Sequence, residues 1–209
     1  MSNDMFMLWR VRRTLAEVLH ARGFDVSELR DETVEDVAAT YTKTPELLTI
    51  CVPHRVTKNL SVVFFHVNFG GAVHKVGVEP VRDYIKVLLS KNISEAIIVV
   101  QQGLTPVAQR EIEASTLHVN IFRMAELVVN VLNHHLVPKH TRLTPEETAQ
   151  LLAKYNVKVS QLPHMYTCDK ISRLLGLRAN DVVRIERPNF VAGMHVTYRH
   201  VVKKMKGDK

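Results

Sequence analysis

Hydrophobic positions in the first part of the chain follow helical spacing. Near the start, apolar residues recur every three or four positions, at Leu8, Val11, Leu15 and Val18. This spacing places them on one face of a helix, and Gly23 marks the helix end because glycine readily adopts the left-handed conformation found there. A second helix is predicted over residues 33–41, capped by Thr33, and a third over residues 79–92, where Pro80 falls in the first turn.

Strands are predicted between these helices, where β-branched and aromatic residues are concentrated. The four segments are residues 47–52, 60–69, 95–102 and 117–122. The third segment begins with a continuous apolar run, as expected of a strand buried on both faces. Turns are predicted at residues 54–59 and at Gly70-Gly71.

Two more helices complete this part of the chain. Thr105 can cap a helix whose first residue is Pro106. Residues 123–135 are predicted to form another helix, which Pro138 must end. The alternation of strands and helices up to residue 137 predicts an α/β layered domain.

The last third of the chain has the pattern of a small α+β module. Thr144, followed by Pro145 and then by Glu147 three positions after the cap, forms a capping box, which predicts a helix start. A short helix over residues 168–176 is expected to end at Gly176. Two strands and the loop between them complete the module: residues 181–187, residues 194–202, and a loop that contains Pro188 and Gly193.

Charge supports a boundary near residue 140. Residues 1–140 hold 15 basic and 15 acidic side chains, whereas residues 141–209 hold 13 and 6, so the net charge of +7 lies in the last third. A basic module is consistent with nucleic acid or with an acidic protein partner, and the final lysines are expected to form a solvated tail. The predicted parts are an N-terminal domain over 1–137, a connector over 138–143 and a C-terminal domain over 144–209.

Composition excludes several classes of protein. The chain is 46% hydrophobic, which is enough to bury a core, and it has no run of about 18 apolar residues to cross a membrane. Its start lacks the basic and apolar segments of a signal peptide. Cys51 and Cys168 match no metal-ligand spacing, so they are interpreted as reduced thiols of an intracellular protein.

Catalytic chemistry is not indicated by the strands. A metal-dependent nuclease built on neighbouring strands needs an acid on one strand, then an acid and a lysine two residues apart on the next. Residues 60–69 contain no acid, and residues 95–102 begin with Glu95 but contain no lysine. A G-x-S-x-G nucleophile motif is also absent from the sequence. The chain is therefore not predicted to be such a nuclease, and these residues indicate no cofactor, whereas a Ser/His/Asp site stays open on sequence alone.

Three histidines, His134, His135 and His140, lie close together in the sequence. A zinc-binding pair on a helix needs a spacing of four and a third ligand, which this stretch does not offer. The prediction is that no metal binds there. His134 and His135 are expected to donate to the free carbonyls at a helix C-terminus, at the joint between the two domains.

Several short motifs in the second half of the chain carry a family resemblance. They are Gln161-Leu162-Pro163, Asp169, Arg173, Gly176-Leu177, Val182-Val183, Arg187-Pro188, Ala192-Gly193 and Tyr198-Arg199. Together with the opening helix, the stretch from Leu127 to His140 and the Leu104–Ala108 element, they resemble the fifth common subunit of eukaryotic nuclear DNA-directed RNA polymerases, which has a counterpart in the archaeal polymerase. The resemblance extends roughly from Met5 to Val202.

The resemblance implies a non-catalytic subunit of a nuclear polymerase, built from an α/β jaw domain with a restriction-endonuclease-like fold and a small α+β assembly domain. The jaw would lie near downstream duplex DNA and the assembly domain would dock on the largest subunit. No membrane or small-molecule partner is implied. The implied DNA-proximal residues are Thr105, Pro106, Val107 and Ala108. The implied partner-binding residues are Leu162, Pro163, Asp169, Arg173, Arg187, Tyr198 and Arg199.

Other interpretations of these residues remain open. Thr105-Pro106 is fully explained as a helix start, although free N–H groups at such a start can also meet a phosphate. Val107 stands where the family usually has Ser, and Asn180 where it commonly has Gly, which suits a divergent member or an isoform confined to one polymerase. The alternative function is a free-standing nucleic-acid-binding protein with an inactive nuclease-like fold. An exposed strand edge in the C-terminal domain could also accept a partner strand.

Overall fold

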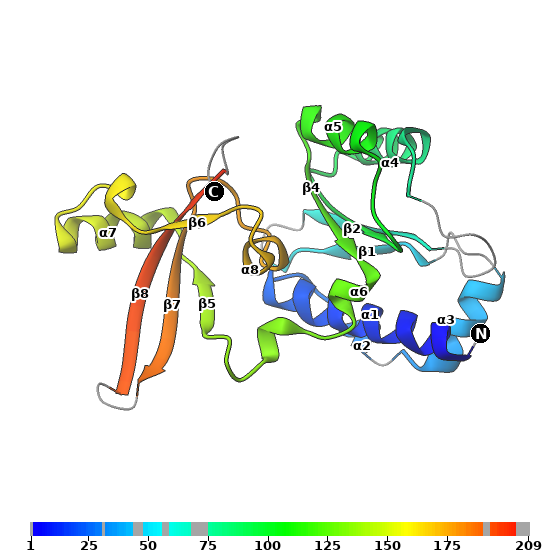
Figure 1. The fold of residues 1–209 in the computed structure, drawn as a ribbon, viewed down its shortest axis with the longest axis horizontal. Helices are drawn as coiled ribbons and strands as arrows, with labels where there is room; N and C mark the ends of the chain where they lie inside the picture. The colour runs from blue at the N-terminus through cyan, green and yellow to red at the C-terminus, as the bar shows by residue number, and fades with distance from the viewer. Residues whose placement is uncertain are drawn as a thin grey trace. The chain divides into compact units, whose positions relative to one another are not determined.

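The structure, a computed structural model, describes residues 2–30, 32–43, 48–55, 59–67, 75–189 and 193–203. The chain divides into two compact units, Met1–Asn130 and Val131–Lys209, each with its own four-stranded sheet (Figure 1). The division falls before residue 137, where the sequence pattern predicts the end of the first domain. Residues predicted to form a connector instead contribute a strand to the sheet of the second unit.

The sheet of the first unit has its strands in chain order. They are β1 (Ile50–Pro53), β2 (Leu60–His66), β3 (Glu95–Val100) and β4 (His118–Arg123). β1 is antiparallel to β2, whereas β2, β3 and β4 are parallel to one another. All four predicted strands are confirmed. The continuous apolar run is also confirmed as a doubly buried strand, because each of residues 96–100 is at most 1% exposed.

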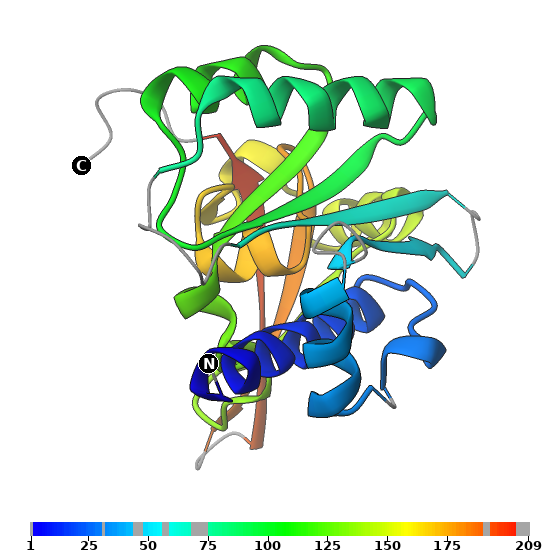
Figure 2. The same cartoon turned by 90° about the vertical axis from the view of Figure 1, so that its right-hand side faces the viewer.

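Helices cover both faces of this sheet and give the unit three layers (Figures 1 and 2). One face carries α4 (Val78–Ser90) and α5 (Pro106–Ala114). The other face carries α1 (Ser2–Ala21), α2 (Ser27–Arg30), α3 (Val34–Lys43) and the short α6 (Met124–Leu127). Strand register explains the layering: Phe64 and Ile98 align and join the core under α4 and α5, while the guanidinium carbon of Arg12 in α1 lies 5.6 Å from the centroid of the Phe65 ring on the opposite face.

The first helix forms as the hydrophobic spacing predicted. Its four spaced apolar residues are all fully buried: Leu8, Val11, Leu15 and Val18. Gly23 ends the helix with a φ of +92°, and a Cβ there would lie 2.9 Å from His54 Nε2. Any other residue would therefore be strained and crowded at this position.

One predicted helix is much shorter than expected. The helix predicted over residues 123–135 is α6, which ends at Leu127, and a single 3-10 turn (Val131–Asn133) follows it in the second unit. β-Branched Val128 and Val129 favour helix poorly. Asn130 Nδ2 donates to Glu17 Oε2 in α1 at 2.6 Å, which holds this segment against another element.

The sheet of the second unit has the strand order β5-β7-β8-β6. Its strands are β5 (Lys139–Arg142), β6 (His164–Tyr166), β7 (Val182–Asn189) and β8 (Gly193–Val202). β7 is antiparallel to both β5 and β8, and β6 is parallel to β8. β5 and β6 were not predicted, because they are short and carry few apolar residues.

The β7–β8 hairpin is longer than predicted. Pro188 and Gly193, which were expected in the joining loop, lie within the two strands. Pro188 is tolerated because β5 pairs with β7 only as far as Glu186, so no neighbouring strand needs the N–H that proline lacks.

Capping signals in the second unit are confirmed at the atomic level. α7 (Pro145–Tyr155) begins with a capping box, in which Thr144 Oγ1 accepts from the Glu147 N–H at 3.2 Å and Glu147 Oε2 accepts from the Thr144 N–H at 2.8 Å. α8 (Lys170–Leu174) is shorter than predicted, and Asp169 is its cap rather than part of its first turn. The Asp169 carboxylate accepts from the Ile171 N–H at 2.8 Å.

Two left-handed residues shape the connection from α8 to β7. Gly176 has a φ of +65°, which confirms it as the residue that ends the helix region. Asn180 has a φ of +74° at the position where the family commonly has Gly. Asparagine is the non-glycine residue best suited to this conformation, so the departure leaves the backbone intact.

Some predictions fall outside the described residues. They are the centre of the turn at 54–59, the break at Gly70-Gly71 and the basic tail beyond residue 203. In the part of the chain that the structure describes, none of the helices combines the length and apolar composition needed to cross a membrane.

Candidate functional surfaces

The start of α5 is the first candidate surface, and it is held in place by the neighbouring backbone. Thr105 Oγ1 accepts from the Ala108 N–H at 3.4 Å, so the predicted cap is confirmed. The Thr105 N–H donates to the Val76 carbonyl at 3.0 Å, which ties the loop before the helix to the segment before α4. Ala108 is fully buried and Val107 is 57% exposed.

This helix start offers few free hydrogen-bond donors. Pro106 has no N–H, and the Ala108 N–H is bound by the cap. Within the described residues, the Val107 N–H is the first-turn donor without a hydrogen bond. A phosphate oxygen could take this N–H and the Thr105 hydroxyl, with the exposed Arg110 one turn further along the helix. Such a contact can hold a phosphate but cannot read a base.

The second candidate surface is one face of the β5-β7-β8 sheet. Three of the predicted partner-binding residues, Asp169, Arg187 and Arg199, lie close enough to His140 to act on its pKa. Strand register places His140, Arg187 and Arg199 on one face of the sheet. His140 aligns with Ile185 and Arg199 with Val183, and residues 183, 185 and 187 of β7 share a face because they alternate along the strand. Arg187 and Arg199 are exposed, so this face presents positive charge to solvent.

His140 is a half-buried residue of this face, on the edge strand β5. Its Nδ1 lies 2.7 Å from the Pro138 carbonyl, so Nδ1 carries the proton that makes this hydrogen bond. Burial lowers the pKa of His140, with smaller contributions in the same direction from Arg199 and Arg187, while the Pro138 hydrogen bond and Asp169 oppose the change. The imidazole therefore favours its neutral form in the folded chain.

Other predicted partner-binding residues lie elsewhere in the second unit. Tyr198 points to the opposite face from Arg199, and its ring centroid is 6.2 Å from that of Tyr155 in α7. The Pro163 carbonyl accepts from the His200 N–H at 2.9 Å and aligns β6 with β8. The predicted set is therefore not one site but is divided between two faces and one edge of the sheet.

Three partly buried histidines predict that acid destabilises the free chain. Burial lowers the pKa of His66, His140 and His200 below the usual value of about 6.5. Below that pH the unfolded chain binds protons that the folded chain does not, so stability present above it is lost as pH falls. The free energy of unfolding, measured with denaturant, should be lower at about pH 5.5 than at about pH 7.5. His140→Asn, which keeps a donor for the Pro138 carbonyl, should reduce the difference in unfolding free energy between the two pH values. An unchanged difference would contradict the role assigned to His140.

His134 and His135 do not lie at the end of a long helix, as they were predicted to do. His134 Nδ1 accepts from the Leu136 N–H at 3.2 Å instead of donating to a carbonyl, because the long helix that would supply free carbonyls does not form. The rings of His134 and His135 stack with centroids 4.6 Å apart. No group of three or more potential metal-ligating side chains exists among the residues that the structure describes.

The acid at the start of β3 has a structural partner. Glu95 Oε1 accepts from Arg22 Nη1 at 2.6 Å, and the Arg22 side chain is only 3% exposed. This carboxylate therefore neutralises a buried cation and is not available as a metal ligand. Cys51 and Cys168 are both free thiols and both exposed.

The sequence pattern did not predict a surface hollow that lies beside α1. It has a volume of about 420 Å³ and is lined by Trp9, Arg12, Arg13, Ala16, Glu17, Leu29 and Glu32. Phe6 stacks on Trp9 with centroids 5.6 Å apart, and the Arg13 guanidinium lies 5.7 Å from the Trp9 ring. The sequence did contain a signal for this surface, because aromatic and basic residues recur three or four positions apart along one helix, at Phe6, Trp9 and Arg13.

Two family models match the chain. The model of the RNA polymerase Rpb5 N-terminal domain matches residues 2–88, and the model of the Rpb5 C-terminal domain matches residues 129–201. The helix start at Thr105 lies between the two matched ranges. The second matched range begins two residues before the division between the two structural units.

Curated relatives match almost the whole chain. The Caenorhabditis briggsae protein "DNA-directed RNA polymerases I, II, and III subunit RPABC1" is 39% identical over 210 residues, which cover 95% of this chain and 97% of the relative. The Dictyostelium discoideum protein of the corresponding name is 34% identical over 94% of this chain and 98% of its own length. The Arabidopsis thaliana protein "DNA-directed RNA polymerases IV and V subunit 5B" is 35% identical over 91% of this chain and 87% of its own length.

Proposed function

This chain belongs to the Rpb5 family of RNA polymerase subunits, and on that premise we propose that its second unit docks on the largest subunit of a nuclear polymerase while its first unit lies beside downstream duplex DNA. The chain is a structural subunit of the polymerase, and other polymerase subunits are its partners. RNA synthesis belongs to the assembled complex. The chain works in the nucleus, where these polymerases act.

The docking proposal rests on the charged face of the second unit. Arg187 and Arg199 are exposed on it, the neutral His140 lies on the same face in the edge strand β5, and Asp169 lies close enough to act on the His140 pKa. Within the described residues, neither arginine has an ion pair with an acid of this chain. A partner surface that offers carboxylates would therefore pair with cations that are already exposed and positioned.

The DNA proposal rests on the start of α5. Thr105, Pro106, Val107 and Ala108 form a well-anchored helix N-terminus with one unbound N–H and a hydroxyl beside it. We assign this unit to the restriction-endonuclease-like fold, with its four-stranded mixed sheet between helices as support. The acid that a nuclease would use for metal is bound to Arg22, so the jaw guides DNA without cutting it.

Affinity purification tests the function as a whole. A tagged chain expressed in its source cells should co-sediment with a very large complex and recover a largest subunit in stoichiometric amount. Recovery of all three nuclear largest subunits in equal amounts would contradict an isoform confined to one polymerase. The alternative, a free-standing nucleic-acid-binding protein, predicts a small species with its own salt-dependent affinity for DNA.

The DNA contact predicts a charge effect at Val107. Val107→Asp should lower the salt concentration at which transcribing complexes lose downstream DNA, because a carboxylate beside the helix start repels phosphate. The same substitution should not weaken the helix, because Val107 is 57% exposed and an acid in the first turn favours the helix dipole. Val107→Ser, which restores the usual family residue, is the matched control and should retain salt resistance. Equal salt resistance of the unmodified chain, Val107→Asp and Val107→Ser would contradict the proposed DNA contact.

A further inference from the structure

The outer edge of β8 is left without a neighbour along most of its length. β8 spans ten residues, but β6 spans three and pairs only with His200–Val202. Residues 193–199 therefore have β7 on one side and no strand of the described chain on the other. Figure 1 shows the β7–β8 ribbon extending well beyond β6 and α7.

Backbone directions identify the unpaired groups on this edge. The His200 N–H donates to Pro163 on the β6 side, whereas the Val201 N–H donates to Asp181 on the β7 side. Successive strand residues point their N–H and C=O groups to opposite sides. Met194, Val196 and Tyr198 consequently direct these groups to the open edge, while the residues between them pair with β7.

The two faces beside this edge differ in chemistry. His195, Thr197 and Arg199 lie on one face together with Arg187 of β7, and all four are exposed. Met194, Val196 and Tyr198 lie on the other face, where Met194 is 60% exposed and the neighbouring β7 residues Arg184 and Glu186 pair with each other at 2.8 Å. The edge thus has unpaired cations on one face, and on the other face apolar edge residues beside an internally neutralised ion pair.

We propose that the β8 edge from Met194 to Tyr198 accepts an extended segment of the largest polymerase subunit as an additional strand, in which acidic or polar side chains alternate with apolar ones. The acidic side chains of this segment face His195 and Arg199, and its apolar side chains cover Met194 and Val196. This inference rests on the proposed function and specifies how the docking partner is held.

Three observations favour a protein strand over nucleic acid. The edge offers C=O acceptors as well as N–H donors, and a phosphate backbone can use only the donors. On one of the two faces the edge residues Met194 and Val196 are apolar and the neighbouring Arg184 is already paired with Glu186, which suits apolar side chains of a protein and not a polyanion. Residues 194–198 contain no Lys or Pro, the residues that commonly protect an exposed edge from strand addition.

Hydrogen exchange with residue resolution tests strand addition on the intact subunit. In the free chain, the amides of His195, Thr197 and Arg199 should already be protected by β7, while those of Met194 and Val196 exchange quickly. In the purified polymerase, exchange at Met194 and Val196 should slow by at least about 100-fold, as expected of newly paired strand amides. Unchanged exchange at these two amides in the polymerase would overturn the proposal. Protection of them by duplex DNA added to the free chain would also overturn it.

A backbone substitution gives a second, independent test. Val196→Pro removes an N–H that faces the open edge and leaves the pairing with β7 intact, because proline is tolerated on edge strands. Recovery of the largest subunit with the tagged variant should fall at least about tenfold relative to Val196→Thr, which keeps the N–H. Far-UV circular dichroism and the unfolding transition establish whether both variants fold. If either variant does not fold, the hydrogen-exchange experiment on the unmodified chain decides the proposal.

The outcomes of these tests separate this inference from the proposed function. Failure of the unmodified chain to recover any largest subunit would reject the function itself. Normal recovery by both the unmodified chain and Val196→Pro would keep the function and reject strand addition at β8.

Discussion

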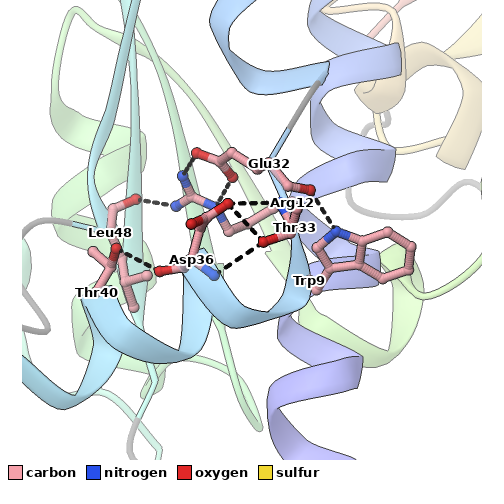
Figure 3. Close-up of polar contacts among 7 residues, drawn as sticks. All are labelled: Trp9, Arg12, Glu32, Thr33, Asp36, Thr40 and Leu48. Atoms are coloured by element: carbon pink, nitrogen blue, oxygen red, sulfur yellow. Dashed lines mark hydrogen bonds and ion pairs between the residues drawn. The ribbon is translucent and has the colours of Figure 1, made fainter.

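Arg12→Ala is expected to destabilise the first unit by about 3 kcal/mol, because it breaks a buried, doubly hydrogen-bonded ion pair. Arg12 Nε and Nη2 donate to the two carboxylate oxygens of Glu32 at 2.7 and 2.6 Å, and Nη1 donates to the Leu48 carbonyl at 2.9 Å (Figure 3). The Arg12 side chain is 8% exposed. Its removal leaves a partly buried carboxylate and a carbonyl without their donor.

Neighbouring substitutions make this prediction specific. Arg13→Ala, one position along the same helix, removes an arginine that is 66% exposed and should change stability by less than about 0.5 kcal/mol. Arg12→Lys keeps the charge but cannot reproduce the two parallel hydrogen bonds, so its loss should be intermediate. The free energy of unfolding in denaturant measures all three variants. Similar losses for Arg12→Ala and Arg13→Ala would show that the ion pair contributes nothing of its own.

The local signals that predicted elements correctly are those that need no distant partner. The capping box at Thr144 and the spacing of Leu8, Val11, Leu15 and Val18 specify helices from neighbouring residues alone. Thr105 is a further case, since its cap is complete within four residues. In each case the interacting residues are close neighbours along one helix.

The signals that failed depend on residues far away in the chain. β5 forms because Lys139–Arg142 pair with β7, roughly forty residues later, and its own sequence has no strand pattern. The helix predicted to continue past Leu127 stops at a segment where Asn130 bonds to Glu17. The Arg12–Glu32 pair likewise joins residues 20 positions apart, one in α1 and one in the segment between α2 and α3. Such long-range pairing overrides local preference and is not visible in a short window of sequence.

The candidate docking face depends on the same long-range pairing. The resemblance supplied Asp169, Arg187 and Arg199 as separate residues. Only the register of β5, β7 and β8 places Arg187 and Arg199 on the same face as His140, and Asp169, the cap of α8, lies close enough to act on the His140 pKa. The open edge of β8 depends on the shortness of β6, which the sequence did not indicate at all. What could be predicted was therefore the residue types of the docking face, and not its geometry.

The second unit should be sensitive to truncation of Leu177, because its core is small. The core cluster consists of Leu177, Val183, Ile185 and Val201, and Leu177 is 2% exposed. Leu177→Ala should lower the free energy of unfolding of this unit by about 2–5 kcal/mol through lost burial and a residual cavity. The total free energy of unfolding of a small domain is only about 5–15 kcal/mol. The β7–β8 amides of the free variant should therefore exchange far faster than those of the unmodified chain.

Leu136→Ala is the matched control for this prediction, because Leu136 lies in the same unit but is 76% exposed and should tolerate the change. Binding to the folded state adds stability by mass action, so Leu177→Ala should regain much of its protection once it is assembled into the polymerase. The β7–β8 amides of assembled Leu177→Ala should then exchange nearly as slowly as those of the assembled unmodified chain. A variant that stays unprotected after stoichiometric assembly would mean that the polymerase does not hold this unit by its folded sheet.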